Sequence, residues 1–270
     1  MTGWKNKIVI VAIFLLALII ISVLVAPLFA RLDPVNHSLD ETWQKPSLKH
    51  WFGTDKFGRD VFARVLYGGR ISFLIAMLAM LLSLFIGIPY GLLSGYLGKK
   101  TDALLSWFIN LFMAIPQFLL ILTIIAILDK NSVTWVIIVI ALFSWMDVAR
   151  LVRNQTLTLK ERDFILAAQV TGLSSLRILV RHILPNLVGS LVVLATLMLA
   201  NIILIESALS FIGLGIQPPT PSWGNIINDG RQALVGCWWI SIFPGLAIIF
   251  TVLCIHIIGE HIQEKNVSRY

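Results

Sequence analysis

Six long stretches of this chain contain no charged residue, and they restrict it to folds that cross a bilayer: 8–30, 71–98, 103–128, 131–146, 183–205 and 232–255. A helix of roughly 20 apolar residues spans the hydrocarbon core, because it satisfies its own backbone hydrogen bonds where no water can. Five stretches have that length, whereas 131–146 reaches it only by continuing to about Arg150, with Asp147 near a membrane face. Only 13% of the residues are charged, against about a quarter in soluble domains. We therefore predict an all-α integral membrane protein with six transmembrane helices.

The distribution of Lys and Arg predicts the orientation of these helices. With six spans both termini lie on the same side, and that side carries somewhat more Lys and Arg than the other. The positive-inside rule then favours cytoplasmic termini by a small margin. The first stretch follows Lys5 and Lys7 and is longer than the apolar core of about 7 to 15 residues in a cleaved signal peptide. We predict an uncleaved anchor.

The second and third spans contain residues that affect how helices pack. Gly87, Gly91 and Gly95 repeat every four residues, and small residues on one helical face allow another helix to approach closely. The spacing supports equally well a span with scattered glycines and a kink at Pro89. Pro116 interrupts the third span, and such a break is tolerated where neighbouring helices restore the lost backbone bond. It indicates a helix that is packed or that moves.

Glu206 directly follows the long apolar stretch 183–205. An ionisable residue at membrane depth is a functional candidate by default. At the end of its span, however, Glu206 could equally face water. Both interpretations remain open from the sequence.

Two polar segments are predicted on the side opposite the termini. Segment 50–72 is predicted to form a helix in the membrane interface just before the second span, since it has apolar residues at roughly helical spacing: Phe57, Val61, Phe62, Val65 and Leu66. Segment 209–231 is rich in Gly and Pro and cannot form a straight helix. It is predicted to form a structured extracytoplasmic loop or a re-entrant turn.

The loop between the fourth and fifth spans is amphipathic and basic. Phe164, Ala167, Ala168 and Thr171 share one helical face, and Gly172 suits the residue just after a helix end. Small residues on an exposed helix suggest a surface that fits the groove of a partner protein. A helix that lies on the bilayer surface is the alternative.

A second helix is predicted to follow in this loop. Ser174 or Ser175 can cap it, and Pro185 begins the next membrane entry. On this helix an apolar stripe and a basic pair occupy different faces: Leu176, Leu179 and Ile183, and Arg177 and Arg181.

Several kinds of chemistry are missing from the sequence. The stretch LLSGYLGKKT comes nearest to a phosphate-binding loop, but Leu93 and Lys100 stand where Gly and Ser or Thr are required. No zinc-protease or nucleophile-elbow motif occurs, and the five histidines are scattered at the ends of the spans. No basic stripe with interleaved aromatic residues indicates nucleic acid. We predict no catalytic residue, no metal site and no nucleic-acid partner, so the energy for any transport must come from elsewhere.

Residues of three segments resemble one protein family. The 160–185 loop resembles the EAA loop of membrane subunits of bacterial binding-protein-dependent ABC importers, through Ala167, Ala168, Gly172, His182, Leu184, Pro185 and Asn186. The two outer segments are similar to those of one subfamily, the C-type permeases of dipeptide, oligopeptide and nickel importers. In the first of them the matching residues are His50, 52–55, 58–60, Arg64, Gly68, Arg70 and Ser72, and the second matches almost throughout.

The resemblance implies a fold, a division of the chain and a set of functional residues. The fold is the type I ABC importer transmembrane domain, with an anchor and outer segment over 1–70, a five-helix core over 71–260 and a cytoplasmic tail over 261–270. The 160–185 loop becomes the coupling helix that docks on an ATPase subunit, through Glu161, Phe164, Ala167, Ala168, Gly172, Arg177, Arg181 and Pro185. Packing or gating falls to Gly87, Gly91, Gly95, Pro116 and Glu206. The extracytoplasmic motif comprises Gly53, Asp55, Gly58, Arg59, Asp60, Gly213, Gly215, Pro218 and Trp223.

The resemblance also implies partners and a location. A multi-pass permease of the bacterial inner membrane would work with a second homologous permease, two ATPase subunits that bind ATP and Mg, an extracytoplasmic solute-binding protein and membrane lipid. This subunit would bind no cofactor itself. Peptides and nickel or other metal chelates both remain as substrates. An ion-gradient-driven secondary transporter is the alternative, but it should show inverted repeats and buried carboxylates, and the sequence indicates neither.

Three departures from the family pattern bear on single residues. Leu166 replaces a common Glu, which removes an ion pair to the ATPase at that position. Trp107 and Asn110 stand where relatives often carry Arg and Asp. The tail, 259–270, lacks the usual Asp-Pro-Arg ending.

Overall fold

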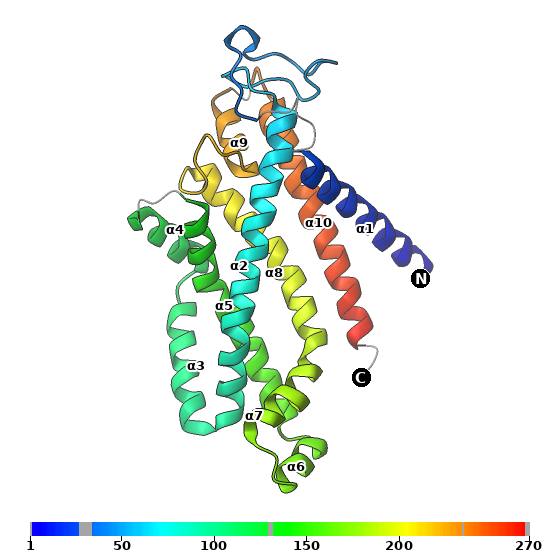
Figure 1. Ribbon diagram of the computed structural model, residues 1–270, viewed down its shortest axis with the longest axis vertical. Coiled ribbons are helices and arrows are strands. Elements are labelled where there is room, and N and C mark those ends of the chain that lie inside the picture. The colour runs from blue at the N-terminus through cyan, green and yellow to red at the C-terminus, as the bar shows by residue number, and fades with distance from the viewer. Residues whose placement is uncertain (1, 27–33, 129–131, 234, 268–270) are drawn as a thin grey trace.

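A computed structural model describes residues 2–26, 34–128, 132–233 and 235–267 of the chain. Parts of the predicted first and fourth spans (27–30 and 131) and of the predicted tail (268–270) lie outside these residues. The described residues are almost entirely helical, with one isolated antiparallel bridge between Thr54 and Asp60. Figure 1 shows a bundle of long helices, with irregular loops at one end and short helices at the other.

The helices are as follows. They comprise α1 (Thr2–Val25), α2 (Val61–Leu97), α3 (Lys99–Met113), α4 (Gln117–Leu128), α5 (Val133–Leu159), α6 (Asp163–Val170), α7 (Ser175–Ile178), a π-helical turn η3 (Leu179–Ile183), α8 (Leu184–Ile212), α9 (Trp223–Gly230) and α10 (Trp239–Val267). Two short 3-10 turns, η2 (Leu39–Glu41) and η4 (Arg231–Ala233), complete them.

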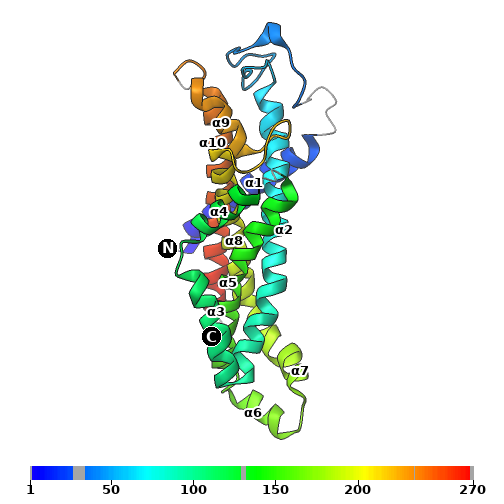
Figure 2. The same ribbon diagram turned by 90° about the vertical axis from the view of Figure 1, so that its left-hand side faces the viewer.

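Within the described residues, five segments are long and apolar enough to cross a membrane, and α3 with α4 provides a sixth if the pair counts as one broken span. The third predicted span, 103–128, is therefore not one straight helix: α3 and α4 meet at 76°. Pro116 explains the break, because it has no backbone N–H and disfavours a helical conformation at the preceding residue. Figure 2 shows α3 and α4 pointing in different directions along the side of the bundle.

The fourth span is longer than predicted. Helix α5 continues past Arg150 to Leu159, so Asp147 lies near its midpoint and not near its end. The prediction that this helix ends at about Arg150 was wrong, because the polar residues after Arg150 continue the helix, and the position of Asp147 relative to a membrane face stays a prediction.

The predicted interfacial helix over 50–72 is also absent from the structure. Residues 50–60 form an irregular loop, and α2 then runs without interruption from Val61 to Leu97. The Asp60 side chain accepts a hydrogen bond from the Ala63 N–H at 2.9 Å and so caps the first turn of α2. Gly53 and Gly58 have φ values of +73° and +70°, a conformation that a continuous helix does not contain. The apolar residues from Val61 onward belong to the first turns of α2.

The centre of the bundle is the contact between α2 and α5. A Cβ on Gly87 would lie 2.6 Å from the Trp145 carbonyl oxygen, and one on Gly91 would lie 2.5 Å from that of Ala149. A Cβ on Gly95 would lie 2.7 Å from Cβ of Thr156. The three glycines therefore let the two backbones touch, which decides between the two interpretations of their spacing.

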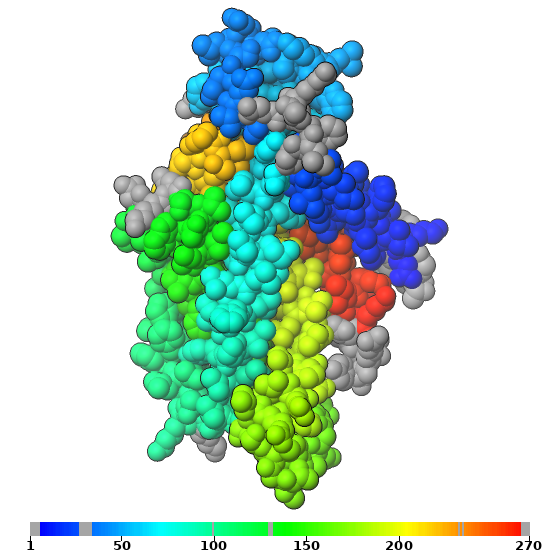
Figure 3. Space-filling model, in the orientation of Figure 1, coloured from blue at the N-terminus to red at the C-terminus, as the bar shows by residue number. Residues whose placement is uncertain are grey.

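Helix α8 packs on α2 and α10, and α1 leans against α10 at the side of the bundle (Figures 1 and 3). Helix α9 closes one end of the bundle, where it packs between α10, α8 and α2. The buried Trp223 side chain donates a hydrogen bond from Nε1 to the Val65 carbonyl oxygen at 2.9 Å. Segment 209–231 is thus a structured loop that contains a short helix, in agreement with the prediction.

Candidate functional site

Residues 34–60 and 213–233, which we call the cap, cover one end of the bundle. Four charged side chains meet inside it. The guanidinium groups of Arg59 and Arg64 each donate to Asp55 at 2.7 Å, and to Asp229 on α9 at 3.1 and 3.0 Å respectively. Lys56 lies 3.5 Å from the same Asp229. Because Asp55, Arg59 and Arg64 are almost fully buried, these ion pairs hold the loop, α2 and α9 in one arrangement.

The sequence analysis singled out Asp55 and Arg59 but missed Asp229. Asp229 is the only carboxylate in segment 209–231. In segment 50–72 the arginines outnumber the acidic residues with which they could pair. Those two facts together could have suggested the pair across the two segments.

Backbone turns in the cap depend on the predicted glycines. A Cβ on Gly58 would lie 1.8 Å from the Ser38 carbonyl oxygen, and one on Gly53 would lie 2.5 Å from that of Gln44. Asp55 accepts hydrogen bonds from the backbone N–H groups of Phe57 and Arg59 at 2.8 and 3.1 Å. The five predicted residues of this motif, Gly53, Asp55, Gly58, Arg59 and Asp60, therefore form one folded unit.

The outer rim of the cap carries a second, more exposed charge group. His50 Nδ1 lies 2.8 Å from Asp60 Oδ2, and its Nε2 lies 3.2 Å from Glu41 Oε2. Lys49 also forms an ion pair with Glu41. The hydrogen bond from Lys49, with a smaller contribution from His50, holds the pKa of the Glu41 carboxyl below its usual value.

The second outer motif follows α8. Gly213 ends α8 in a left-handed conformation with φ +91°, and a Cβ on Gly215 would lie 2.2 Å from Ser210 Oγ. Trp223 begins α9 directly after a capping box between Ser222 and Asn225. Pro218 lies on the exposed part of the intervening loop.

Glu206 is fully buried between α8 and α2 and does not face water. The hydroxyl groups of Ser72 and Ser210 each donate to its carboxylate at 2.8 Å. The expectation that the chain has no buried carboxylate was therefore wrong, because an end-of-span position in the sequence gave no sign of the cap that covers it.

The opposite end of the molecule consists of α6, α7 and the turn between them, which we call the coupling end. Gly172 has φ +77° just after α6, and a Cβ there would meet no atom within 4 Å. The predicted helix stop at Gly172 is confirmed. Ser174 precedes α7 as predicted, although its side chain makes no capping hydrogen bond.

The exposed face of α6 differs from the predicted one. Ile165 and Ala168 are buried against the rest of the chain, so Ala168 does not lie on the outer surface with Phe164 and Ala167. Larger apolar side chains are exposed instead: Phe164, Leu166 and Val170, the last at 88%. Glu161, Arg177 and Arg181 are also exposed.

The second half of the loop is continuous with the next span. Residues Ser175–Ile212 form one helical segment, so Pro185 does not begin a separate helix. The missing N–H of Pro185 removes one backbone bond, and the π-helical turn η3 lies directly before it. Of the predicted apolar stripe Leu179 and Ile183 are buried, but Leu176 is 72% exposed.

Polar contacts that the sequence analysis missed join the helices near the coupling end. Arg153 on α5 donates to Asp102 on α3 at 2.6 Å, and Ser94 on α2 donates to Asp102 at 2.8 Å. Lys160, just after α5, donates to the Gly95 carbonyl oxygen at 3.0 Å. Across 2–26, 34–128, 132–233 and 235–267, no group of three or more His, Cys, Asp or Glu side chains could hold a metal ion.

Comparison with known proteins gives consistent matches. Residues 87–267 match the family model described as binding-protein-dependent transport system inner membrane component. The oligopeptide transport system permease protein OppC of Bacillus subtilis (strain 168) is 36% identical over 96% of this chain and 85% of that protein. The dipeptide transport system permease protein DppC of Alkalihalophilus pseudofirmus is 38% identical over the same shares.

The fold is similar to that of a solved structure. A structure of the MetNI methionine ABC transporter in an inward-facing conformation has a chain with a TM-score of 0.60. The similarity covers 73% of this chain and 94% of that chain at 20% identity.

Proposed function

The chain belongs to the family of inner membrane components of binding-protein-dependent transport systems, and from that premise we propose that it is the permease subunit of an ATP-driven peptide importer. Relatives that match 96% of the chain are named as oligopeptide and dipeptide permeases, which favours peptides over nickel chelates. The proposal includes a second permease, two ATPase subunits and a solute-binding protein as partners. We also propose that both termini lie in the cytoplasm.

The observation that carries this proposal is the exposed apolar surface of the coupling end. Leu166 and Val170 lie four residues apart and face outward from α6 on one side, and Phe164 is exposed on another side of the helix. Helix α6 lies beyond the ends of α2 and α5 (Figure 1). Exposed apolar residues gathered on one surface mark a site of protein or membrane contact. We assign this surface to the cytoplasmic ATPase, whose closure would move α6 and α7. A bilayer-surface helix remains the competing interpretation, and the experiment below separates the two.

A route for that movement runs through tightly packed elements. Helix α5 leads into α6 through the three residues 160–162. Lys160 donates a hydrogen bond to the Gly95 carbonyl oxygen near the end of α2. The glycine contact joins α2 and α5 along much of their length. A displacement of α6 would therefore move α2 and α5 as one unit, while the break at Pro116 lets α4 move separately from α3.

The cap is the proposed docking face for the solute-binding protein. Its ion pairs and tight turns give a fixed surface at the end of the bundle opposite the coupling end (Figure 1). The proposed docking face thus keeps its shape while the other end moves.

A secondary transporter driven by an ion gradient is the alternative, and the buried carboxylate of Glu206 is a feature that favours it. Its carboxylate, however, is held by Ser72 and Ser210 beneath the cap. The two functions are separated by whether uptake needs ATP or a gradient.

The test uses proteoliposomes that contain the whole transporter. Uptake of labelled dipeptide, oligopeptide and nickel, with and without histidine as chelator, is measured with ATP inside and then with an ion gradient alone. We expect ATP-dependent uptake of a peptide, lost in Gly172→Arg and kept in Gly172→Asn, since Asn tolerates a positive φ. Undiminished uptake in Gly172→Arg, with the protein inserted, would contradict the coupling role. Gradient-driven uptake without ATP would contradict the importer itself.

A further inference from the structure

A hollow of about 420 Å³ lies between α5 and α8, and we call it the α5–α8 groove. Its lining combines three leucines and Met198 with five polar residues: Ser144, Asp147, Arg150, Asn154 and Asn201. Arg150 and Asn154 also line a second hollow of about 280 Å³ against α3. The polar surface therefore extends from α8 across α5 to α3.

The groove lies at the level of the middle of the spans. Asp147 is near the midpoint of α5, roughly 20 Å from either end at 1.5 Å per residue. Near this level Gly87 on α2 contacts Trp145 and Val148 on α5, well inside the charge-free stretch 71–98. A hydrocarbon environment at this depth is unfavourable for charged side chains, which are found in membrane proteins where they face a partner or a water-filled cavity.

The two charged side chains of the groove, Asp147 and Arg150, attract each other, but hydrogen bonds to the described residues do not account for their position. Asp147, Arg150 and Asn201 form no side-chain hydrogen bond and no ion pair within 4 Å to any residue that the structure describes. Asp147 and Arg150 are three residues apart on one helix, which makes them neighbours on its surface. A negative and a positive group thus stand side by side, the carboxylate able to accept hydrogen bonds and the guanidinium able to donate them.

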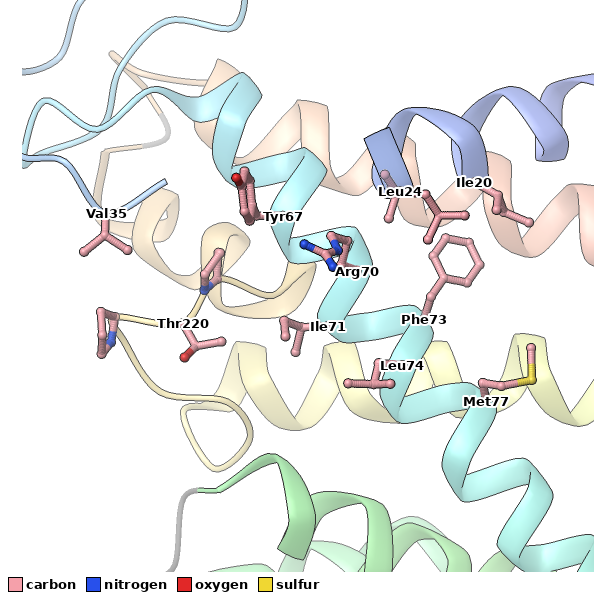
Figure 4. Close-up of a pocket in the computed structure, with 13 residues that line it drawn as sticks. Ile20, Leu24, Val35, Tyr67, Arg70, Ile71, Phe73, Leu74, Met77 and Thr220 are labelled. Atoms are coloured by element: carbon pink, nitrogen blue, oxygen red, sulfur yellow. The ribbon is translucent and has the colours of Figure 1, made fainter. Parts of the chain in front are cut away.

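A third hollow, at the side of α2, differs from the α5–α8 groove in its lining. The space of about 660 Å³ between α1, α2 and the loop at 219–221 is lined mostly by apolar side chains, with Arg70 as its one charged residue (Figure 4). Lipid tails satisfy such a lining, so this hollow requires no polar occupant. The α5–α8 groove, by contrast, has charges of both signs and amides in its lining.

We propose that the α5–α8 groove is a water-filled part of the transport path in which a zwitterionic solute contacts Asp147 through its ammonium group and Arg150 through its carboxylate. Asn154 and Asn201 are then placed to bind amide groups of the same solute. A solute with one charge satisfies one of the two side chains, whereas a zwitterion satisfies both. This inference rests on the proposed importer function and adds the solute contact within this subunit.

The test measures whether water and solute reach the groove in the complete transporter. Asn201→Cys is introduced after Cys237→Ser and Cys254→Ala, with Asn154→Cys as a second position in case the first variant does not insert. Phe85→Cys is the matched control, because Phe85 is exposed on α2 within an apolar stretch. A charged thiol reagent reacts with the ionised thiol, which forms in water.

We expect Asn201→Cys to react about tenfold faster than Phe85→Cys, because only a water-exposed thiol ionises readily. A zwitterionic dipeptide supplied with its binding protein and ATP should slow the reaction, whereas the same peptide blocked at both ends should not. Equal reaction rates at Asn201→Cys, Asn154→Cys and Phe85→Cys would overturn the proposal, since lipid or the second permease would then seal the groove. Reaction without protection by the dipeptide would also overturn it.

A second measurement tests the charge. Asp147→Asn should raise the KM for dipeptide uptake severalfold while ATP hydrolysis still responds to the loaded binding protein. Glu260→Gln, on the exposed surface of α10, is the control and should leave the KM and the ATPase response unchanged. An Asp147→Asn variant with the same KM as Glu260→Gln would refute the role of Asp147. If the unsubstituted transporter shows no ATP-driven uptake, the importer function itself is wrong. Normal uptake with an unprotected groove refutes only the solute contact.

Discussion

The cap and the coupling end of this molecule are built in opposite ways. In the cap, buried Asp55, Arg59 and Arg64 form ion pairs with each other and with Asp229, and backbone turns pack against backbone. At the coupling end, apolar side chains face outward, and a Cβ on Gly172 would meet no atom within 4 Å. The comparison teaches that the cap is completed by contacts within the chain, whereas the coupling end leaves apolar side chains exposed, which we propose the ATPase covers.

The largest effect on stability is expected in the cap. Arg64→Met leaves Asp55 and Asp229 short of a partner in a buried site, and the loss of one member of a buried ion pair costs about 3–5 kcal/mol of folding free energy. Arg70→Met, at an exposed position on the same helix, should change the folding free energy by less than about 0.5 kcal/mol. Thermal unfolding of the purified protein in detergent measures both. Equal midpoints for the two variants would show that the cap is not held by its ion pairs.

Two glycines sharpen the comparison because both have a positive φ. Gly58→Ala places a methyl group against the Ser38 backbone, so we expect the strain of about 1 kcal/mol plus a steric cost of a further 1–3 kcal/mol. Gly172→Ala meets open space and should cost only the strain of about 1 kcal/mol. The same unfolding measurement compares them, and a larger cost at Gly172 would contradict the difference between the two ends.

A polar substitution on the coupling end should separate stability from transport. Val170→Asp should change the free energy of unfolding by less than about 0.5 kcal/mol, because Val170 is exposed in this chain. It should nevertheless abolish ATP-driven uptake, since a charge would face the apolar contact with the ATPase. Leu48→Asp, equally exposed but in the cap, is the control for ATPase binding. Normal co-purification of the ATPase with Val170→Asp would mean that α6 does not form this contact.

The smallest effect concerns pH at the rim of the cap. Because Lys49 lowers the pKa of Glu41 in the folded state, this pair contributes stability above the ordinary pKa of 4.5 and loses it as the pH falls through the lowered value. The unfolding midpoint should therefore fall slightly more in acid for the unsubstituted protein than for Lys49→Met. Salt should weaken the difference, because Glu41 is exposed and screened. An unchanged difference at high salt would point to a buried contact instead.

Much of the architecture was predictable from the sequence. The charge-free stretches located the spans, and the resemblance to a permease family named the fold that the comparisons confirm. Gly172 was predicted to end a helix, and it does. The prediction of a helix over 50–72 was wrong. Helical spacing of apolar residues in a short segment does not reveal that the helix begins later, directly after the capping residue Asp60. The predicted small face of α6 is exposed at Phe164, Ala167 and Thr171 but buried at Ala168, since the sequence does not say which face of a helix meets the rest of the chain.

The sequence by itself determined where the chain can enter a membrane and where its helices stop. Hydrocarbon excludes charges and unpaired backbone groups, and a left-handed turn favours glycine, so both are local constraints that single residues express. Only the tertiary structure decided that Asp229 pairs with Arg59 and Arg64, that serines enclose Glu206, and that Asp147 and Arg150 line a groove between α5 and α8. These contacts join positions far apart in the chain, and they depend on how deep each helix sits and which way it is turned.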